Sequence, residues 1–253
     1  MSKIGGKRRR VEEIESKDSK KMKAGTDVPT AILKNVLSTS ELSALRKEVD
    51  AILSTERVDL VKSECVVDIF EGIAIEDETI RTNREKYMKS RESLCILSKS
   101  EYAVIRNLLL LKLPNCLRDV LKLKESDDVF LFNEHYVVKP ARSSMEFRWH
   151  RDGDLQLAML RALKKTSKYY SFWCALDDMS SRNGTLRFPN NEEIRVNAGD
   201  VVLFDSETLH SSGQNTTDKP RRVFYAQYST EPIRIPPRGD VLSFAIPCIF
   251  KEK

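Results

Sequence analysis

The segment Trp149-His150-Arg151-Asp152-Gly153 contains residue types that bind metal ions. A neutral imidazole and a carboxylate two positions apart at a strand end can lie on one face, because side-chain direction alternates along a strand. His150 and Asp152 would then supply two of the three protein ligands of a non-haem Fe(II) oxygenase site, which leaves positions open for a cosubstrate and oxygen. A His-x-Asp pair also arises by chance, so the assignment depends on a third ligand elsewhere in the chain.

The third ligand is expected at His210, which lies 58 positions beyond Asp152. A Gly199-Asp200 turn and an apolar strand at 201–204 precede this histidine. A turn followed by a strand would return His210 to the mouth of the same barrel as the His-x-Asp pair.

An arginine follows this histidine at the spacing of a cosubstrate anchor. Arg221 lies eleven positions after His210, at the start of a strand with alternating apolar residues. Its planar, permanently charged guanidinium with forked donors suits the distal carboxylate of 2-oxoglutarate. The neighbouring Arg222 would point to the other face of the strand, and the spacing from His210 favours Arg221 as the anchor.

Further segments follow one another in the order of a known family. They are Lys139-Pro140, Trp173-Cys174-Ala175-Leu176-Asp177-Asp178, Asn183-Gly184-Thr185-Leu186, Ala198-Gly199-Asp200-Val201-Val202-Leu203-Phe204 and His210-Ser211-Ser212-Gly213-Gln214-Asn215. With the His-x-Asp segment and Arg221, they resemble the phytanoyl-CoA dioxygenase family of Fe(II)- and 2-oxoglutarate-dependent oxygenases over residues 129–229. A helix expected at 38–54 resembles the helix that opens this family's domain, so the likeness extends from about residue 28 to the C-terminus.

The resemblance implies specific roles for several side chains. His150, Asp152 and His210 would bind iron, and Arg221 would pair with the C5 carboxylate of 2-oxoglutarate. Three more residues would contact the cosubstrate: Ser212 at the same carboxylate, Trp173 as a wall of its pocket, and Asn133 as a polar contact.

Residue type alone leaves alternatives for three of these positions. Trp173 is as compatible with a plain core tryptophan as with a pocket wall. Ser212 could simply serve the turn in which it lies. His135 alternates with Asn133 along a predicted strand, and we interpret it as a hydrogen-bonded core histidine rather than a site residue.

The implied activity is hydroxylation with Fe(II), 2-oxoglutarate and O2, and with succinate and CO2 as coproducts. The family's usual substrates are small or acyl-carrier-linked metabolites.

This chain departs from many relatives at residues 188–193, which lack a Pro-Gly-Ser-His segment, and in a long basic loop after Asp152. A nuclear oxygenase acting on a protein or nucleic acid, and a catalytically silent 2-oxoglutarate-binding module, are the alternatives.

The periodicity around these motifs predicts a mainly β fold with flanking helices and a double-stranded β-helix (jelly-roll, cupin-like) core at about 129–230. A capping box at 38–41 opens the helix at 38–54, and a second helical region at 101–124 is interrupted at Pro114. A helix at 154–165 carries a basic edge made by Arg161, Lys164, Lys165 and Lys168. Strands are expected at 65–70, 129–138, 171–176, 185–188, 193–196, 201–204 and 222–228.

Length and charge suggest one domain at 28–253 behind a tail at 1–27 that we expect to be disordered. Residues 1–24 hold nine Lys or Arg and four Asp or Glu, so their balance of +5 equals the net charge of the whole chain. The remainder is neutral, which argues against a nucleic-acid-binding core. The basic runs at 7–10 and 20–23 are typical of either a nuclear-import signal, which would recruit import machinery, or a solvated tail.

Two compositional features bear on location. Cys65, Cys95, Cys116, Cys174 and Cys248 form no Cys-x-x-Cys pair, so we expect reduced thiols rather than disulfides or a zinc site. No run of eighteen apolar residues and no apolar signal core occur, so neither a membrane span nor secretion is indicated. An intracellular protein, nuclear or cytoplasmic, is expected.

Overall fold

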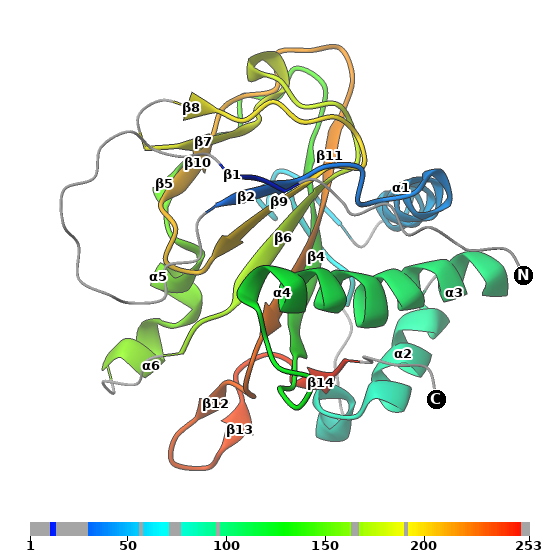
Figure 1. Cartoon of the computed structure of the whole chain (residues 1–253). Coiled ribbons are helices and arrows are strands. Elements are labelled where there is room, and N and C mark those ends of the chain that lie inside the picture. Colours follow the sequence, from blue (N-terminus) through cyan, green and yellow to red (C-terminus); the bar gives the residue numbers. More distant parts are fainter. Residues whose placement is uncertain are drawn as a thin grey trace, which may run out of the picture.

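The computed structural model describes residues 11–13, 30–55, 58–70, 77–94, 97–162, 167–189 and 192–248. Its centre is two stacked antiparallel sheets (Figure 1). The larger sheet runs in the order β1 (Val11–Glu13), β2 (Ala31–Leu33), β9 (Val201–Asp205), β6 (Tyr170–Ala175), β11 (Arg221–Ser229), β4 (Phe130–Lys139) and β14 (Ile246–Pro247), with β3 (Val66–Asp68) also paired to β4.

The smaller sheet runs in the order β5 (Phe147–His150), β10 (His210–Ser212), β7 (Leu186–Phe188) and β8 (Glu192–Glu193). From β5 to β11 the chain passes back and forth between the two sheets, which is the winding of a double-stranded β-helix. The predicted fold class is therefore confirmed. A short hairpin of β12 (Arg234–Ile235) and β13 (Asp240–Val241) follows the last long strand.

The alternating side chains of β11 show how the core is packed on both faces of the larger sheet. Val223 and Tyr225 face the smaller sheet and pack in a cluster with Trp173. Phe224 and Ala226 point the other way and pack beneath the helices. Because successive side chains of a strand point to opposite faces, one strand lines both layers of the core.

Helices cover the outer face of the larger sheet (Figure 1). They are α1 (Thr39–Leu53), α2 (Arg84–Ser93), α3 (Lys99–Asn107) and α4 (Leu113–Leu121), with single turns at Glu78–Arg81 and Ser181–Asn183. The helix predicted at 38–54 is confirmed, including the Ser38 and Glu41 capping box.

The interruption expected at Pro114 takes another form. The π turn Leu108–Lys112 joins α3 to α4, and Pro114 lies in the first turn of α4. A proline lacks the backbone N–H of a regular helix turn, and the wider π turn accommodates it without ending the helical run.

A buried ion cluster ties the helices to the sheet. The Arg91 guanidinium donates to Glu48 Oε1 at 2.8 Å and to Glu134 Oε1 at 2.7 Å, and all three side chains are buried. Tyr136 donates to Glu48 Oε2 at 2.5 Å, and Tyr87 donates to Glu134. These hydrogen bonds link α1 and α2 to the face of β4 that points away from the smaller sheet.

Other expectations are met in part. The helix predicted at 154–165 is two short helices, α5 (Asp152–Gln156) and α6 (Ala158–Ala162), and residues 163–166 lie outside the described residues. The strand expected at 193–196 ends at Glu193, and Val196 forms only an isolated bridge with Met179.

Within the tail that we expect to be disordered, Val11–Glu13 pairs with β2, and the rest of residues 1–27 lies outside the described residues. Cys65, Cys116, Cys174 and Cys248 are free thiols, as predicted, and Cys95 is not among the described residues. In the part of the chain that the structure describes, no helix is long and apolar enough to cross a membrane.

Candidate metal centre

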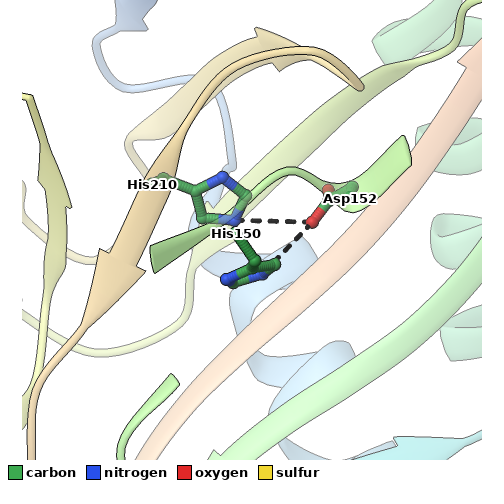
Figure 2. Close-up of side chains that lie close together, drawn as sticks. All are labelled: His150, Asp152 and His210. Atoms are coloured by element: carbon green, nitrogen blue, oxygen red, sulfur yellow. Dashed lines mark ion pairs between the residues drawn. The ribbon is translucent and has the colours of Figure 1, made fainter. Parts of the chain in front are cut away.

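Three predicted ligands meet at one end of the smaller sheet. His150 ends β5, Asp152 begins α5, and His210 begins β10 opposite His150 (Figure 2). One ligand atom from each lies within 4.8 Å of the others. Asp152 Oδ1 lies 3.4 Å from His210 Nε2 and 3.6 Å from His150 Nε2. Two ligands at right angles, each about 2.1 Å from one ion, lie about 3 Å apart, so the three side chains are nearly in place for a metal.

A β-bulge aims His150 at the site. His210 pairs with His150, and Ser212 pairs with Phe147. The chain therefore advances by two residues on β10 and by three residues on β5 between these two pairs. The extra residue in β5 lets both Phe147 and His150 line the cavity beside the metal site, while Trp149 stays 47% exposed at its rim. Bulges often re-aim a side chain next to an active site.

Backbone carbonyls fix both imidazole rings. His150 Nδ1 lies 2.7 Å from Arg148 O, and His210 Nδ1 lies 2.9 Å from Thr208 O. A carbonyl oxygen can only accept, so each Nδ1 carries the proton and each Nε2 presents a lone pair toward Asp152. This is the usual arrangement of metal-binding histidines, in which the second ring nitrogen is held by a hydrogen bond.

The electrostatics favour the metal-binding forms of Asp152 and His210. Burial opposes ionisation of Asp152, but hydrogen bonds and charge from His150, His210 and Ser171 hold its pKa below the usual range. Burial lowers the pKa of His210, which keeps that ring neutral. Proximity to the Asp152 carboxylate raises the pKa of His150, so a metal would displace a proton from this ring in the acidic range. A carboxylate and neutral imidazoles are the forms that coordinate metal ions.

The second oxygen of Asp152 is held from the larger sheet. Ser171 Oγ on β6 donates to Asp152 Oδ2 at 2.9 Å, and Gln227 Nε2 on β11 donates to Ser171 Oγ at 3.0 Å.

Gly153 N donates to Ser206 O at 2.9 Å, and a Cβ at Gly153 would lie 2.9 Å from the same oxygen. The glycine of the motif is therefore needed for close approach to the loop that leads to His210.

A cavity of about 570 Å³ adjoins the three ligands, within the range of about 300–1,000 Å³ that is typical of small-molecule sites. Arg221 lines it, whereas Arg222 points away and bonds Asp177 and Asp50. The choice between the two arginines is thus decided by the alternation of β11.

The Arg221 guanidinium is held by the turn at Asn183-Gly184. Arg221 donates to the carbonyls of Asn183 and Gly184, and its Nη1 is buried without a hydrogen-bond partner among the described residues. Gly184 has φ of 74°, and a Cβ there would lie 2.2 Å from Gly213 O. Only glycine accepts this conformation and this contact, which explains the Asn-Gly pair in the sequence.

A second buried cation lies beside Arg221. Lys139 is fully buried, and its Nζ donates to Ser212 Oγ at 2.9 Å and to the carbonyls of Ser212 and Gly213. Burial and the charge of Arg221 lower the pKa of Lys139 to about 7, and burial lowers that of Arg221 to about 10. Neither cation forms an ion pair within the described residues, so this inner end of the cavity fits an anion.

The remaining predicted residues divide into two groups. Ser212 and Trp173 line the cavity, and the Arg221 guanidinium lies 5.5 Å from the Trp173 ring centroid. Asn133 faces Gln227 across β4 and β11 but does not line the cavity. His135 is not the hydrogen-bonded core histidine that we expected, because it lines the cavity, stacks on Tyr225 and has no hydrogen-bond partner among the described residues.

Sequence reasoning assigned no role to Lys139, Ser171 or Gln227. Lys139 stood in a recognised segment, Lys139-Pro140, but nothing indicated that its ammonium is buried. Gln227 lies six positions after Arg221, so strand alternation places both on one face. Ser171 had no signal of its own.

Comparison with known proteins agrees with this geometry. The model of the phytanoyl-CoA dioxygenase (PhyH) family matches residues 30–189 and 190–223. The chain belongs to this family. No curated protein sequence shows significant similarity to this phytanoyl-CoA dioxygenase family member.

Solved structures share its fold. The epimerase SnoN, in complex with Fe3+, alpha ketoglutarate and nogalamycin RO, has a TM-score of 0.53 at 17% identity, and the match covers 88% of this chain and 91% of SnoN. AviO1 from Streptomyces viridochromogenes Tue57 has a TM-score of 0.51 at 16% identity, with coverage of 82% and 91%. EvdO2 from Micromonospora carbonacea var. aurantiaca, complexed with 2-oxoglutarate, has a TM-score of 0.50 at 19% identity, with coverage of 82% and 89%.

Proposed function

We propose that this family member is an Fe(II)- and 2-oxoglutarate-dependent oxygenase that hydroxylates a small molecule. The observation that carries the proposal is the convergence of His150, Asp152 and His210, with ligand atoms within 4.8 Å of one another and each imidazole held at Nδ1 by a backbone carbonyl. Two nitrogens and one carboxylate on one face of an ion are the ligand set of non-haem Fe(II) oxygenases.

The cavity's inner end supports 2-oxoglutarate as the cosubstrate. Arg221 offers an unpartnered buried Nη1, and Lys139 adds a second positive charge beside Ser212. A dicarboxylate could place its far carboxylate against these donors while its 2-oxo acid end reaches the metal. Bound iron and 2-oxoglutarate would supply the oxidising chemistry, with succinate and CO2 as coproducts.

The protein's own residues would bind, orient and exclude water. Ser171 and the two histidine-bound carbonyls keep the metal ligands in one geometry, which spares reorganisation when the metal binds. Trp173 and Tyr225 form apolar walls on the larger sheet, and both are buried. These walls shield the region between the metal and Arg221 from bulk water.

The basic edge after Asp152 gives little support for an anionic substrate. Arg161 is paired with Asp154 at 2.7 Å and with Glu207 at 2.5 Å, and Lys168 is paired with Asp205 at 3.3 Å. Lys164 and Lys165 lie outside the described residues. The described part of this edge therefore fastens α6 and the segment before β6 to the loop that precedes His210.

The binding test uses the purified full chain under anaerobic conditions. Addition of Fe(II) and 2-oxoglutarate should produce a weak visible charge-transfer band, and a His150→Ala, His210→Ala double variant should lack it. Circular dichroism of the double variant checks that it is folded. A wild-type protein without the band, or a folded double variant that keeps it, contradicts the proposal.

The type of reaction is tested by mass. Metabolite and peptide pools are incubated with Fe(II), 2-oxoglutarate and air, and hydroxylation should give a product heavier by one oxygen that depends on His150. A product of unchanged mass would indicate epimerisation, the activity named for SnoN. Metal-dependent thermal stabilisation by 2-oxoglutarate with no product from any pool would indicate a binding module.

A further inference from the structure

The side chain of Gln227 has an orientation that its neighbours determine. Ser171 has one hydroxyl proton, and it donates that proton to Asp152 Oδ2 at 2.9 Å, because a carboxylate can only accept. Ser171 Oγ must therefore accept from its other neighbour, which is Gln227 Nε2 at 3.0 Å. If the Gln227 amide were flipped, its Oε1 would lie against Ser171 Oγ. The Ser171 hydroxyl proton is already donated to Asp152, so these two oxygens would repel each other. Gln227 Oε1 thus points away from Ser171.

This oxygen is an acceptor without a donor. Gln227 is 1% exposed and lines the cavity, and its Oε1 has no hydrogen-bond partner among the described residues. Gln156 on α5 lines the same cavity, and its Oε1 is also buried without a partner in the described part of the chain. Leaving a buried polar atom unpaired is costly, so such atoms mark places where a ligand or a water molecule completes the hydrogen bond.

The two ends of the cavity differ in charge. Arg221 and Lys139 make the inner end positive, whereas Gln227 lies six positions farther along β11, with its amide 3.4 Å from Asp152 Oδ2. Gln227 Oε1 and Gln156 Oε1 are neutral acceptors, and the cavity is also lined by the charged side chains of Glu64, Glu146, Arg148 and Arg151. An ionised carboxylate or phosphate cannot donate to these two oxygens, which require a hydrogen-bond donor.

We propose that the metal end of the cavity binds the substrate through a neutral hydrogen-bond donor, a hydroxyl or an amide N–H, which bonds Gln227 Oε1 beside the reacting carbon. This inference rests on the proposed function and narrows its substrate to molecules with a hydroxyl or amide near the oxidised position. An unfunctionalised acyl chain is disfavoured, because it would leave Gln227 Oε1 buried and unpaired.

Matched probes test the proposal without turnover. The full chain is loaded with Zn(II) and 2-oxoglutarate, and binding is followed by ligand-observed NMR. The probes are cyclohexanol with fluorocyclohexane, and hexanamide with methyl hexanoate, so that each pair differs mainly in the donor. Gln227→Met keeps the length of the side chain and removes the acceptor together with the Nε2 donor to Ser171, so Zn(II) affinity is measured for this variant as well. Gln156→Met tests the second acceptor, and Gln214→Met is the matched control on an exposed glutamine.

For each pair, the measured quantity is the ratio of the affinity for the probe with the donor to the affinity for the probe without it. This ratio should be about three- to tenfold larger in wild type than in Gln227→Met, which is the effect of one hydrogen bond to a buried acceptor. Gln214→Met should keep the wild-type preference. A Gln227→Met variant that keeps the wild-type preference, as expected if a fixed water molecule satisfies Gln227 Oε1, overturns the proposal. Failure of wild type to bind Zn(II) or 2-oxoglutarate would instead contradict the proposed function.

Discussion

Lys139 donates a hydrogen bond from its buried ammonium to Ser212 Oγ, 2.9 Å away. Because an ammonium cannot accept, the Ser212 hydroxyl proton is left free to turn into the cavity, which Ser212 lines together with Arg221. A lysine that does not itself line the cavity thereby orients a donor that does. Two cations and one hydroxyl then surround the inner end.

Replacing this lysine should weaken 2-oxoglutarate binding. Lys139→Met keeps most of the volume but removes the charge and frees Ser212 to rotate, so we expect affinity to fall about tenfold to a hundredfold, the range for hydrogen bonds to charged groups. Calorimetric titration of the Zn(II)-loaded protein measures the change. The comparison ligand is 2-oxobutyrate, which lacks the far carboxylate and should bind equally to both proteins. Equal losses for both ligands would show a general distortion of the site.

As the pH rises above 7, Lys139 should increase the free energy of unfolding and decrease the affinity for 2-oxoglutarate. Its pKa is about 7 in the folded protein and 10.5 ordinarily, so between these values the unfolded chain binds more protons. Its contribution to the free energy of unfolding therefore rises with pH over this window. Anion binding needs the charged form, so 2-oxoglutarate affinity should fall by up to about tenfold per pH unit above pH 7.

Denaturant unfolding and calorimetry at several pH values check both slopes. Between pH 7 and 9, Lys139→Met should lose each slope, because the pKa of the neighbouring Arg221, about 10, lies above this range. A wild-type affinity that is flat from pH 7 to 9 would contradict the assignment of the low pKa to Lys139.

The two adjacent arginines should behave differently. Arg221→Lys removes the buried guanidinium, whose Nη1 has no hydrogen-bond partner among the described residues, and we expect at least a tenfold loss in 2-oxoglutarate affinity. Arg222→Lys weakens bonds to Asp177 and Asp50 on the opposite face and should leave that affinity within about twofold, because none of these three side chains lines the cavity. The same titration measures both variants, and equal losses would place the anchor elsewhere.

The buried cluster under the helices should govern stability rather than metal binding. Arg91→Met leaves the Glu48 and Glu134 carboxylates buried without their cation, and we expect a loss of about 3–5 kcal/mol in the free energy of unfolding. Lys47→Met breaks the exposed pair with Glu101 and should leave the free energy of unfolding nearly unchanged. Urea denaturation distinguishes them, and Zn(II) affinity should be unchanged in both.

Several features of the site followed from local sequence. The spacing of His150 and Asp152, the turn and apolar strand before His210, and the alternation that separates Arg221 from Arg222 are properties of single strands. They could be predicted because side-chain direction within a strand depends only on position along it. The capping box of α1 is local in the same way.

Other features depended on contacts between distant segments. Pairing of β5 with β10 joins residues about sixty positions apart, and its bulge decides that both Phe147 and His150 face inward. Asn133 was expected to contact the cosubstrate, but only the register of β4 against β11 shows that it lies beyond the cavity, next to a bulge at Gln227.

The sequence by itself indicated the three candidate metal ligands, the succession of most strands along the chain and the choice of Arg221 over Arg222, because these depend on residue type and strand period. Only the tertiary structure decided the polarity of the cavity. The burial of Lys139 without an acid and the unpaired oxygen of Gln227 both arise where strands distant in the chain meet. Burial and hydrogen-bond satisfaction are properties of the whole packed fold, and no local pattern encodes them.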